Sequence, residues 1–220
     1  TFTRLGKQIA IAVKAGGPEP ENNPTLRSVI ATCKRENMPK DNIERAIKNA
    51  MGKDQSDYKG MTYEGYGPHG IAFLVETATD NTNRTVANVR MYFNKCGGTL
   101  GNSGSVGFLF DHKCVFKFRA AEGVDPEELE LEMIDLGVDE FYSEEDGITV
   151  YAPYESFGAI QKWLDDKGYE IVSGESVYLP TDTKELDAEG RESIEKLVEK
   201  LEEDDDVTNV YHNMKEVDEE

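Results

Sequence analysis

Five glycines between residues 97 and 107 form the densest local pattern in the sequence: Gly97, Gly98, Gly101, Gly104 and Gly107. Glycine-rich turns can present backbone N–H groups to phosphate. The series lacks the Gly-Lys-Ser/Thr ending of a P-loop and follows a predicted helix instead of opening one, so we expect no nucleoside triphosphate site. Two interpretations stay open: a connecting loop that tolerates positive φ, or a loop that approaches a nucleic-acid backbone.

Cysteine and histidine residues give no metal-binding pattern. The cysteines are odd in number, widely spaced and surrounded by apolar residues, as reduced core cysteines are: Cys33, Cys96 and Cys114. The three histidines lie far apart, and none stands at ligand spacing from another histidine or a cysteine. We therefore expect no disulfide framework, no metal and no cofactor.

Carboxylates are abundant but show no catalytic arrangement. The acidic runs at residues 202–206 and 216–220 are typical of a solvated face and a frayed tail. The sequence has no Gly-x-Ser-x-Gly motif, no His-Glu-x-x-His motif and no setting that would activate a cysteine. We expect a protein that is not an enzyme and has no small-molecule substrate.

Lysine and arginine side chains remain as candidates for chemistry, because they can contact the phosphates of a nucleic acid. In the first helices they alternate with apolar positions, so we expect them to face outward, and a second group falls on a predicted helix in the middle of the chain. The predicted nucleic-acid-binding residues are Arg4, Lys7, Lys14, Arg27, Lys34, Arg35, Lys40, Arg45, Lys48, Lys53, Arg84, Arg90 and Lys95. A solvated helix surface is the alternative, which composition alone does not exclude.

Three predicted helices position the first group of cations. Apolar residues at helical spacing predict a helix over residues 3–15 that ends at a pair of glycines. Asn23 before Pro24 predicts the N-cap and first residue of the second helix. Asp41 with Glu44 is a variant of the capping box and predicts the start of the third.

The rest of the chain alternates strands and helices, which predicts an α+β fold. The pattern gives strand, helix, strand, strand over residues 71–118, and helix, strand over residues 189–211. Together these elements would form a ferredoxin-like β-α-β-β-α-β sheet with a second small α+β domain inserted into it. In this scheme residues 106–110 and 114–118 are its second and third strands.

Four segments are therefore expected. They are a basic helical domain with its linker, a ferredoxin-like domain in two pieces, an inserted acidic α+β domain and an acidic tail. Their boundaries are residues 1–60, 61–119 plus 182–214, 120–181 and 215–220.

Charge is unevenly distributed along a chain whose formal net charge is -20. Residues 1–60 hold 11 Lys and Arg against 7 Asp and Glu, residues 61–119 hold 6 against 4, and residues 120–220 hold 7 against 33. A polyanion would be repelled by the second half but not by the first. No apolar run approaches the ~20 residues that span a bilayer, and no signal-peptide pattern opens the sequence, so we expect a cytoplasmic protein without a membrane partner.

Several motifs in register resemble the YebC/PmpR family. The N-terminal part contains GGPEPENNPTLR at residues 16–27 and NMPKDNIERAI at residues 37–47. The middle of the chain contains, in order, YEGYGP, TDN, NRTV, GTLG and GSV, which begin at Tyr63, Thr79, Asn83, Gly98 and Gly104. The match weakens beyond residue 120.

The resemblance implies three domains, a helical one followed by two α+β ones, and a cytoplasmic regulator that binds nucleic acid. Family members usually begin with a short Lys-rich segment ahead of the first helix, which the resemblance implies upstream of Thr1. Where the family often has three glycines and Asp, this sequence has Gly16-Gly17-Pro18, so we expect a stiffer loop.

Two functions follow from the resemblance and stay open. The first is a DNA-binding transcriptional regulator, and the alternative is a translation factor that binds the ribosome and its RNA and relieves stalling at proline runs. The sequence shows no clear helix-turn-helix, finger or basic zipper, which favours structured RNA, whereas the family description favours DNA. A third class is an adaptor whose acidic half docks a basic protein, which salt-sensitive binding without residues 1–60 would support.

Overall fold

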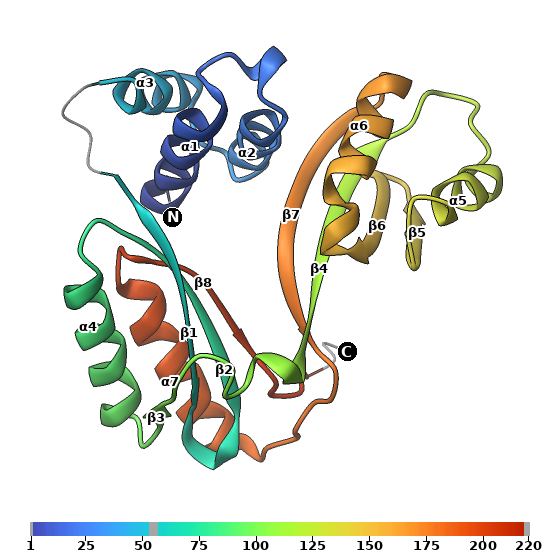
Figure 1. Ribbon diagram of the computed structural model, residues 1–220. Coiled ribbons are helices and arrows are strands. Elements are labelled where there is room, and N and C mark those ends of the chain that lie inside the picture. The colour runs from blue at the N-terminus through green and yellow to red at the C-terminus, as the bar shows by residue number, and fades with distance from the viewer. Residues whose placement is uncertain (1, 53–56, 218–220) are drawn as a thin grey trace. The chain divides into compact units, whose positions relative to one another are not determined.

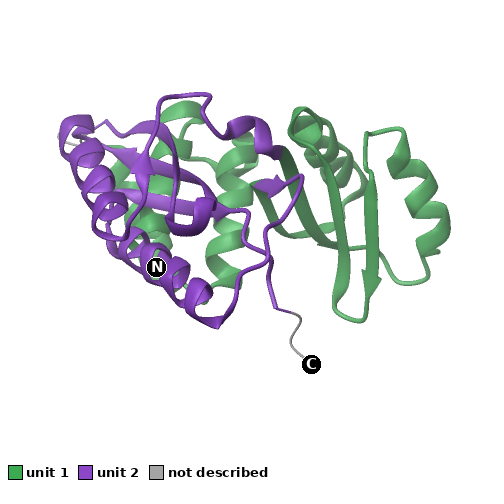
Figure 2. Ribbon diagram, turned by 90° about the horizontal axis from the view of Figure 1, so that it is seen from below, with its two compact units in different colours: residues 1–55, 112–177 green, residues 56–111, 178–220 purple. Residues whose placement is uncertain are grey.

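The computed structural model describes residues 2–52 and 57–217. The chain divides into two compact units, residues 1–55 with 112–177 (unit 1) and residues 56–111 with 178–220 (unit 2), which Figure 2 shows in different colours. N-terminal helices followed by two four-stranded sheets with helices confirm the predicted α+β class for the described residues. The predicted domain boundaries stay a prediction, because unit 1 holds both the helical part and most of one sheet.

Unit 1 begins with a helical part in which two helices pack on the first. The helices are α1 (Phe2–Gly16), α2 (Pro24–Arg35) and α3 (Lys40–Ala50). Asn23 is the N-cap of α2, as predicted, because its Oδ1 accepts from the Leu26 N–H at 3.1 Å. The same side chain donates to the Ala12 carbonyl of α1 at 2.8 Å, and a Cβ on Gly16 would lie 2.8 Å from Asn23 Cγ. The Asn23 side chain therefore connects α1 to α2, and the absence of a Cβ at Gly16 leaves room for it.

The start of α3 differs from the prediction. Its N-cap is Pro39, which offers no side-chain hydrogen bond, and Asp41 already lies in the first helical turn. The predicted capping box of Asp41 and Glu44 is therefore wrong. Pro39 holds φ near -59°, so the helix begins directly after it, and the Asp41 charge interacts with the positive end of the helix dipole instead.

Residues 110–180 form a ferredoxin-like β-α-β-β-α-β fold (Figure 1). Its strands pair in the order β5-β6-β4-β7, so β4 lies in the interior of the sheet. The fully buried side chains of Phe116, Phe118, Met133 and Leu164 join the sheet to its two helices. The elements are β4 (Phe110–Arg119), α5 (Pro126–Ile134), β5 (Glu140–Glu144), β6 (Gly147–Pro153), α6 (Phe157–Lys167) and β7 (Glu170–Pro180).

Unit 2 contains the other sheet, with strand order β3-β1-β2-β8 and helices α4 and α7 side by side (Figure 1). Phe73 of β2 and Phe93 of α4 meet edge to face with ring centroids 5.7 Å apart, and Ile194 and Leu197 of α7 complete this core. The elements are β1 (Lys59–Tyr66), β2 (Ala72–Thr79), α4 (Thr82–Lys95), β3 (Thr99–Leu100), α7 (Ala188–Glu203) and β8 (Val207–His212).

The strand content of the first predicted sheet is wrong in three places. Strand β1, at residues 59–66, was not predicted, because glycines and polar side chains hide its alternation. Residues 106–110 are mostly a 3-10 turn, Gly107–Leu109. Residues 114–118 do form a strand, but β4 pairs with β6 and belongs to the other sheet. The β-α-β-β-α-β order therefore exists, but residues 110–180 form it, and strands β1, β2, β3 and β8 take no part in it.

Candidate nucleic-acid interface

Four predicted cations lie exposed on the end of α2 and along α3, and we call them the α2–α3 cations: Lys34, Lys40, Arg45 and Lys48. Helix α3 buries Ile43 and Ala50 on its inward face, while Lys40, Arg45 and Lys48 are exposed on its other sides. Within the described residues the four cations have one ion pair, from Lys40 to Glu44 at 3.7 Å, in which the lysine is 84% exposed. Such an exposed pair holds its lysine only weakly.

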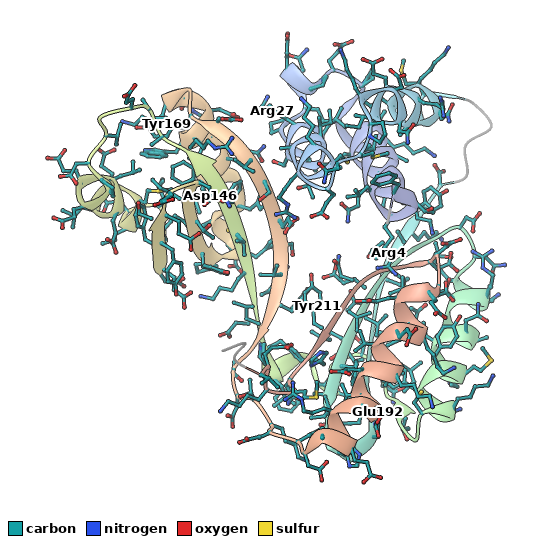
Figure 3. All side chains as sticks on the ribbon, turned by 180° about the vertical axis from the view of Figure 1, so that it is seen from behind. Arg4, Arg27, Asp146, Tyr169, Glu192 and Tyr211 are labelled. Atoms are coloured by element: carbon teal, nitrogen blue, oxygen red, sulfur yellow. The ribbon has the colours of Figure 1, made fainter. Side chains whose placement is uncertain are left out.

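Two other predicted cations of α2 are paired with carboxylates of the same unit. Arg27, labelled in Figure 3, forms an ion pair with Asp165 of α6. Arg35 Nη2 lies 2.7 Å from Glu175 Oε1 of β7, and its Nη1 donates to Ser173 Oγ at 3.0 Å. These guanidinium groups connect α2 to the ferredoxin-like fold, so their charge is largely neutralised before any phosphate arrives.

Gln161 strengthens the same contact, and sequence reasoning missed it. It is buried, and its Nε2 donates to the Pro24 carbonyl and to Ser28 Oγ, both at 2.6 Å. A buried amide needs such partners, but its position within α6 gives no hint that they lie in α2. The one usable signal would have been a prediction that the face of α6 carrying Gln161 is buried, because a buried amide must have hydrogen-bond partners.

The first helix does not present all its cations to solvent. Lys7 is only 9% exposed and lies on the inward face of α1, so the prediction that it faces outward is wrong. A lysine stem can pack along apolar residues, which is why the apolar spacing did not exclude it. Lys14 is exposed and Arg4 is half-buried, whereas Lys53 lies outside the described residues.

The cations of α4 in unit 2 do not converge. Arg84 makes a bidentate contact with the buried carboxylate of Asp206, Nε to Oδ2 at 3.1 Å and Nη2 to Oδ1 at 2.9 Å, and it also reaches Asp80 at 3.0 Å. Both carboxylates raise the pKa of Arg84 further above its ordinary value, Asp206 most. Arg90 and Lys95 are exposed. Arg84 and Arg90 are six residues apart, a rotation of about 240° around a helix, so they point to different sides.

The glycine-rich loop already holds an anion of the protein itself. Glu64 is 8% exposed, and its carboxylate accepts from the N–H groups of Gly104 and Gly107, both at 2.5 Å, and of Val106 at 3.2 Å. A Cβ on Gly107 would lie 2.8 Å from Glu64 Oε1. Of the two interpretations, the structure favours the connecting loop, because these N–H groups point at Glu64.

Other candidate chemistry finds little support in the described ranges. No group of three or more His, Cys, Asp or Glu side chains there is placed to hold a metal ion, and no helix there is long and apolar enough to cross a membrane. Burial raises the pKa of the Cys33 and Cys114 thiols to about 11, so both stay protonated near neutral pH.

The fold and these cations define a class: an α+β protein whose exposed positive charge is concentrated on a helical N-terminal part. The chain belongs to the TACO1/YebC family, because the family model described as "TACO1/YebC protein N-terminal domain" matches residues 1–53 and the one described as "TACO1/YebC second and third domain" matches residues 58–214.

Named relatives agree. A "Probable transcriptional regulatory protein" of Bacteroides thetaiotaomicron is 67% identical over 218 residues, which cover 98% of this chain and 88% of the relative. A protein of the same name from Porphyromonas gingivalis is 62% identical over 215 residues, covering 98% and 89%. Among solved structures, a "Conserved Hypothetical Protein Aq1575 from Aquifex Aeolicus" matches with a TM-score of 0.78 at 37% identity, covering 99% of this chain and 90% of that one.

Proposed function

We propose that the chain is a non-enzymatic, nucleic-acid-binding regulator of gene expression that contacts DNA through the α2–α3 cations. One observation carries the proposal: these cations are exposed and almost without ion pairs among the described residues, whereas Arg27, Arg35 and Arg84 are held by carboxylates. Phosphate contact requires cations that no internal carboxylate has neutralised. The names of the relatives support a regulatory role.

The connection between α2 and α3 favours DNA as the ligand. Four residues, Glu36–Pro39, join the two helices, and Asn37 takes a left-handed conformation with φ of 61°. Helix-turn-helix proteins join two helices by a turn of this length and place the second helix in the major groove. No clear helix-turn-helix was recognised in the sequence, because this turn contains asparagine and proline and lacks glycine.

The acidic residues of α3 limit how far its contact with DNA can recognise base sequence. Asp41 and Glu44 lie exposed in its first turns, where a recognition helix normally approaches base edges. A carboxylate there repels phosphate, so the later cations Arg45 and Lys48 are the better placed for the backbone. We therefore expect binding that depends strongly on salt and weakly on base sequence.

Replacing Lys34, Arg45 and Lys48 together with Ala tests the proposal. Each lost phosphate contact lowers the slope of log K against log salt by about 0.9 for duplex DNA, so the slope should become shallower by about 2 to 3. The measurement is fluorescence anisotropy with a 30-base-pair duplex and, in parallel, a structured RNA hairpin and purified ribosomes, at several salt concentrations.

A matched control carries the same change in net charge: Lys162, Lys167 and Lys196, all exposed in the acidic half, replaced together with Ala. It should leave the salt slope unchanged, because only local cations release counterions. An equal decrease of the salt slope in both triple variants would contradict the proposed contact between the α2–α3 cations and DNA. Ribosome binding that survives near-physiological salt while DNA binding disappears would replace the DNA proposal with the translation-factor alternative.

A further inference from the structure

Helices α5 and α6 pack on one face of the ferredoxin-like sheet. Cys114, Phe116 and Phe118 of β4 point toward α5 and α6, so the alternate residues of β4, β5 and β6 lie on the opposite face. We call this the open face of the sheet. Its residues in β4, β5 and β6 are half-buried or exposed: Lys113, Val115, Lys117, Arg119, Glu140, Tyr142, Glu144, Thr149 and Tyr151.

Apolar side chains form a continuous strip across the open face. Val115 of β4 lies directly opposite Tyr151 of β6, and Tyr142 of β5 lies opposite Thr149 of β6. The Tyr142 and Tyr151 rings meet edge to face with centroids 6.1 Å apart, and Tyr142 is 49% exposed. The strip thus runs from an interior strand to the edge strand β5, with its outermost aromatic in solvent.

Carboxylates dominate the charge around this strip. Lys117 lies 2.6 Å from Asp146, Arg119 lies 3.2 Å from Glu170, and Lys113 forms an ion pair with Asp139, so the three cations are neutralised. The Lys117 contact lowers the pKa of Asp146. Asp146 is labelled in Figure 3, in the turn between β5 and β6.

Two further carboxylates, Glu140 and Glu144, lie on either side of Tyr142 along β5, and neither has an ion pair within the described residues. The Glu140 charge raises the pKa of Tyr142. A polyanion would meet net repulsion here, although tyrosine rings can stack on bases.

Strand β5 also ends the sheet, since the pairing order starts with it. An edge strand exposes main-chain N–H and C=O groups to which another strand can pair. Its two carboxylates would repel the edge of a second, identical acidic copy. They would attract lysine or arginine instead, so charge complementarity selects one kind of occupant.

We propose that β5 and the open face dock an extended, basic segment of a partner protein, which pairs with the β5 edge. Because side chains of neighbouring strands lie opposite each other, its residues facing Glu140 and Glu144 are lysine or arginine, and its residue facing Tyr142 is aromatic or β-branched. The segment therefore reads cation, any residue, aromatic, any residue, cation. This interaction is independent of the nucleic-acid contact on α2 and α3.

Fluorescence anisotropy with the full chain and a labelled nonapeptide, Lys-Val-Lys-Val-Tyr-Val-Lys-Val-Lys, tests the proposal. Tyr142→Ser and, separately, Glu140→Lys with Glu144→Lys should each weaken binding at least tenfold. Leu131→Ser, on an exposed position of α5 in the same acidic fold, should leave it unchanged. A peptide with proline in place of two central valines should not bind, because proline removes the donors that pair with a strand edge.

Several results would overturn the proposal. They are no binding at 1 mM peptide, equal binding of the proline peptide, which would indicate attraction to charge alone, and binding that Tyr142→Ser leaves unchanged. An oligouridylate that binds more tightly than the peptide and is lost in Tyr142→Ser would make the open face a nucleic-acid surface instead. Circular dichroism of each variant shows whether it keeps the parent fold.

Discussion

Glu64 occupies the place in the glycine-rich loop that a phosphate would need. Three backbone N–H groups of residues 104–107 donate to its carboxylate, so the loop is folded around a carboxylate supplied by β1. The glycines are needed for close approach: a Cβ on Gly101 would lie 2.7 Å from Ser105 Oγ, and one on Gly98 would lie 2.4 Å from the Tyr66 carbonyl. Such an arrangement stabilises a turn, and its three N–H groups already have Glu64 as their acceptor.

Glu64→Gln should therefore lower the free energy of unfolding by about 1 to 3 kcal/mol, since a buried hydrogen-bonded charge is replaced by an amide whose NH2 group faces backbone donors. Urea denaturation measures the loss. Amide hydrogen exchange should accelerate most at Gly104, Val106 and Gly107. Glu144→Gln, an exposed position, is the matched control and should change neither quantity.

Several local capping residues can be recognised in the sequence, although the capping box expected at Asp41 and Glu44 was wrong, and long-range partners cannot be recognised there. Asn23, Asn81 and Asp125 cap their helices through N–H groups two or three residues away, so the cap and its donor are visible in one short string. Glu64 and Gln161 bond to groups 40 to 43 and 133 to 137 residues away, respectively. The residues next to Glu64 or Gln161 in the sequence do not indicate which distant group each side chain bonds to.

The secondary structure elements were predicted well where hydrophobic periodicity is strong, and poorly where a strand forms, or joins a sheet, because of the strands it pairs with. Helix α7, with four buried residues at helical spacing, begins within one residue of its predicted start at residue 189. Strand β1 has exposed or half-buried side chains over its first five residues, so it forms chiefly because β2 and β3 pair with it. Strand β4 was predicted as a strand but assigned to the wrong sheet, since alternation fixes which face is buried and not which strand lies alongside.

Strand β8 ends in His212, and this histidine should make the pairing of β8 with β2 sensitive to acid. His212 lies opposite Phe73 of β2, its ring centroid is 5.6 Å from that of Phe73, and its Nδ1 accepts from the Met214 N–H at 3.2 Å. Burial lowers the pKa of His212 below its ordinary value of 6.5. The folded state therefore binds this proton less readily than the unfolded state does.

Stability should consequently fall as pH drops below about 6.5, because the unfolded chain gains a proton that the folded chain resists. Above that pH the ring is neutral in both the folded and the unfolded chain, so His212 adds no pH dependence to the free energy of unfolding. His212→Asn keeps an acceptor for the Met214 N–H but does not titrate, so urea denaturation at pH 5.0 and 7.5 should show a smaller difference for the variant than for the parent chain. An equal difference in both would exclude His212 as the source.

At the scale of the whole molecule, positive charge is exposed in the helical part and negative charge in the ferredoxin-like fold. Residues 120–180 hold two lysines and no arginine, and the open face neutralises its own cations. The sequence predicted this asymmetry by counting. It could not predict that Arg27 and Arg35 join the two parts of unit 1, because each pair spans more than 130 residues.

The topology implies that residues 110–180 can fold alone, although the sequence placed the boundary at residue 120. β4 lies in the interior of its sheet and contributes three fully buried side chains, Cys114, Phe116 and Phe118, to its core. A fragment of residues 110–180 has a complete β-α-β-β-α-β set, whereas one of residues 120–181 lacks an interior strand and exposes the strands on either side of it.

We expect the longer fragment to unfold cooperatively in urea with a far-ultraviolet spectrum of mixed helix and strand, and the shorter one to show no cooperative transition. A domain of about 70 residues is stable only when most of its apolar surface is buried, so losing three core residues is decisive. Cooperative unfolding of the shorter fragment, or its absence in the longer one, would contradict the assignment of β4. The two fragments differ at their N-termini chiefly by this strand, so the comparison isolates its contribution.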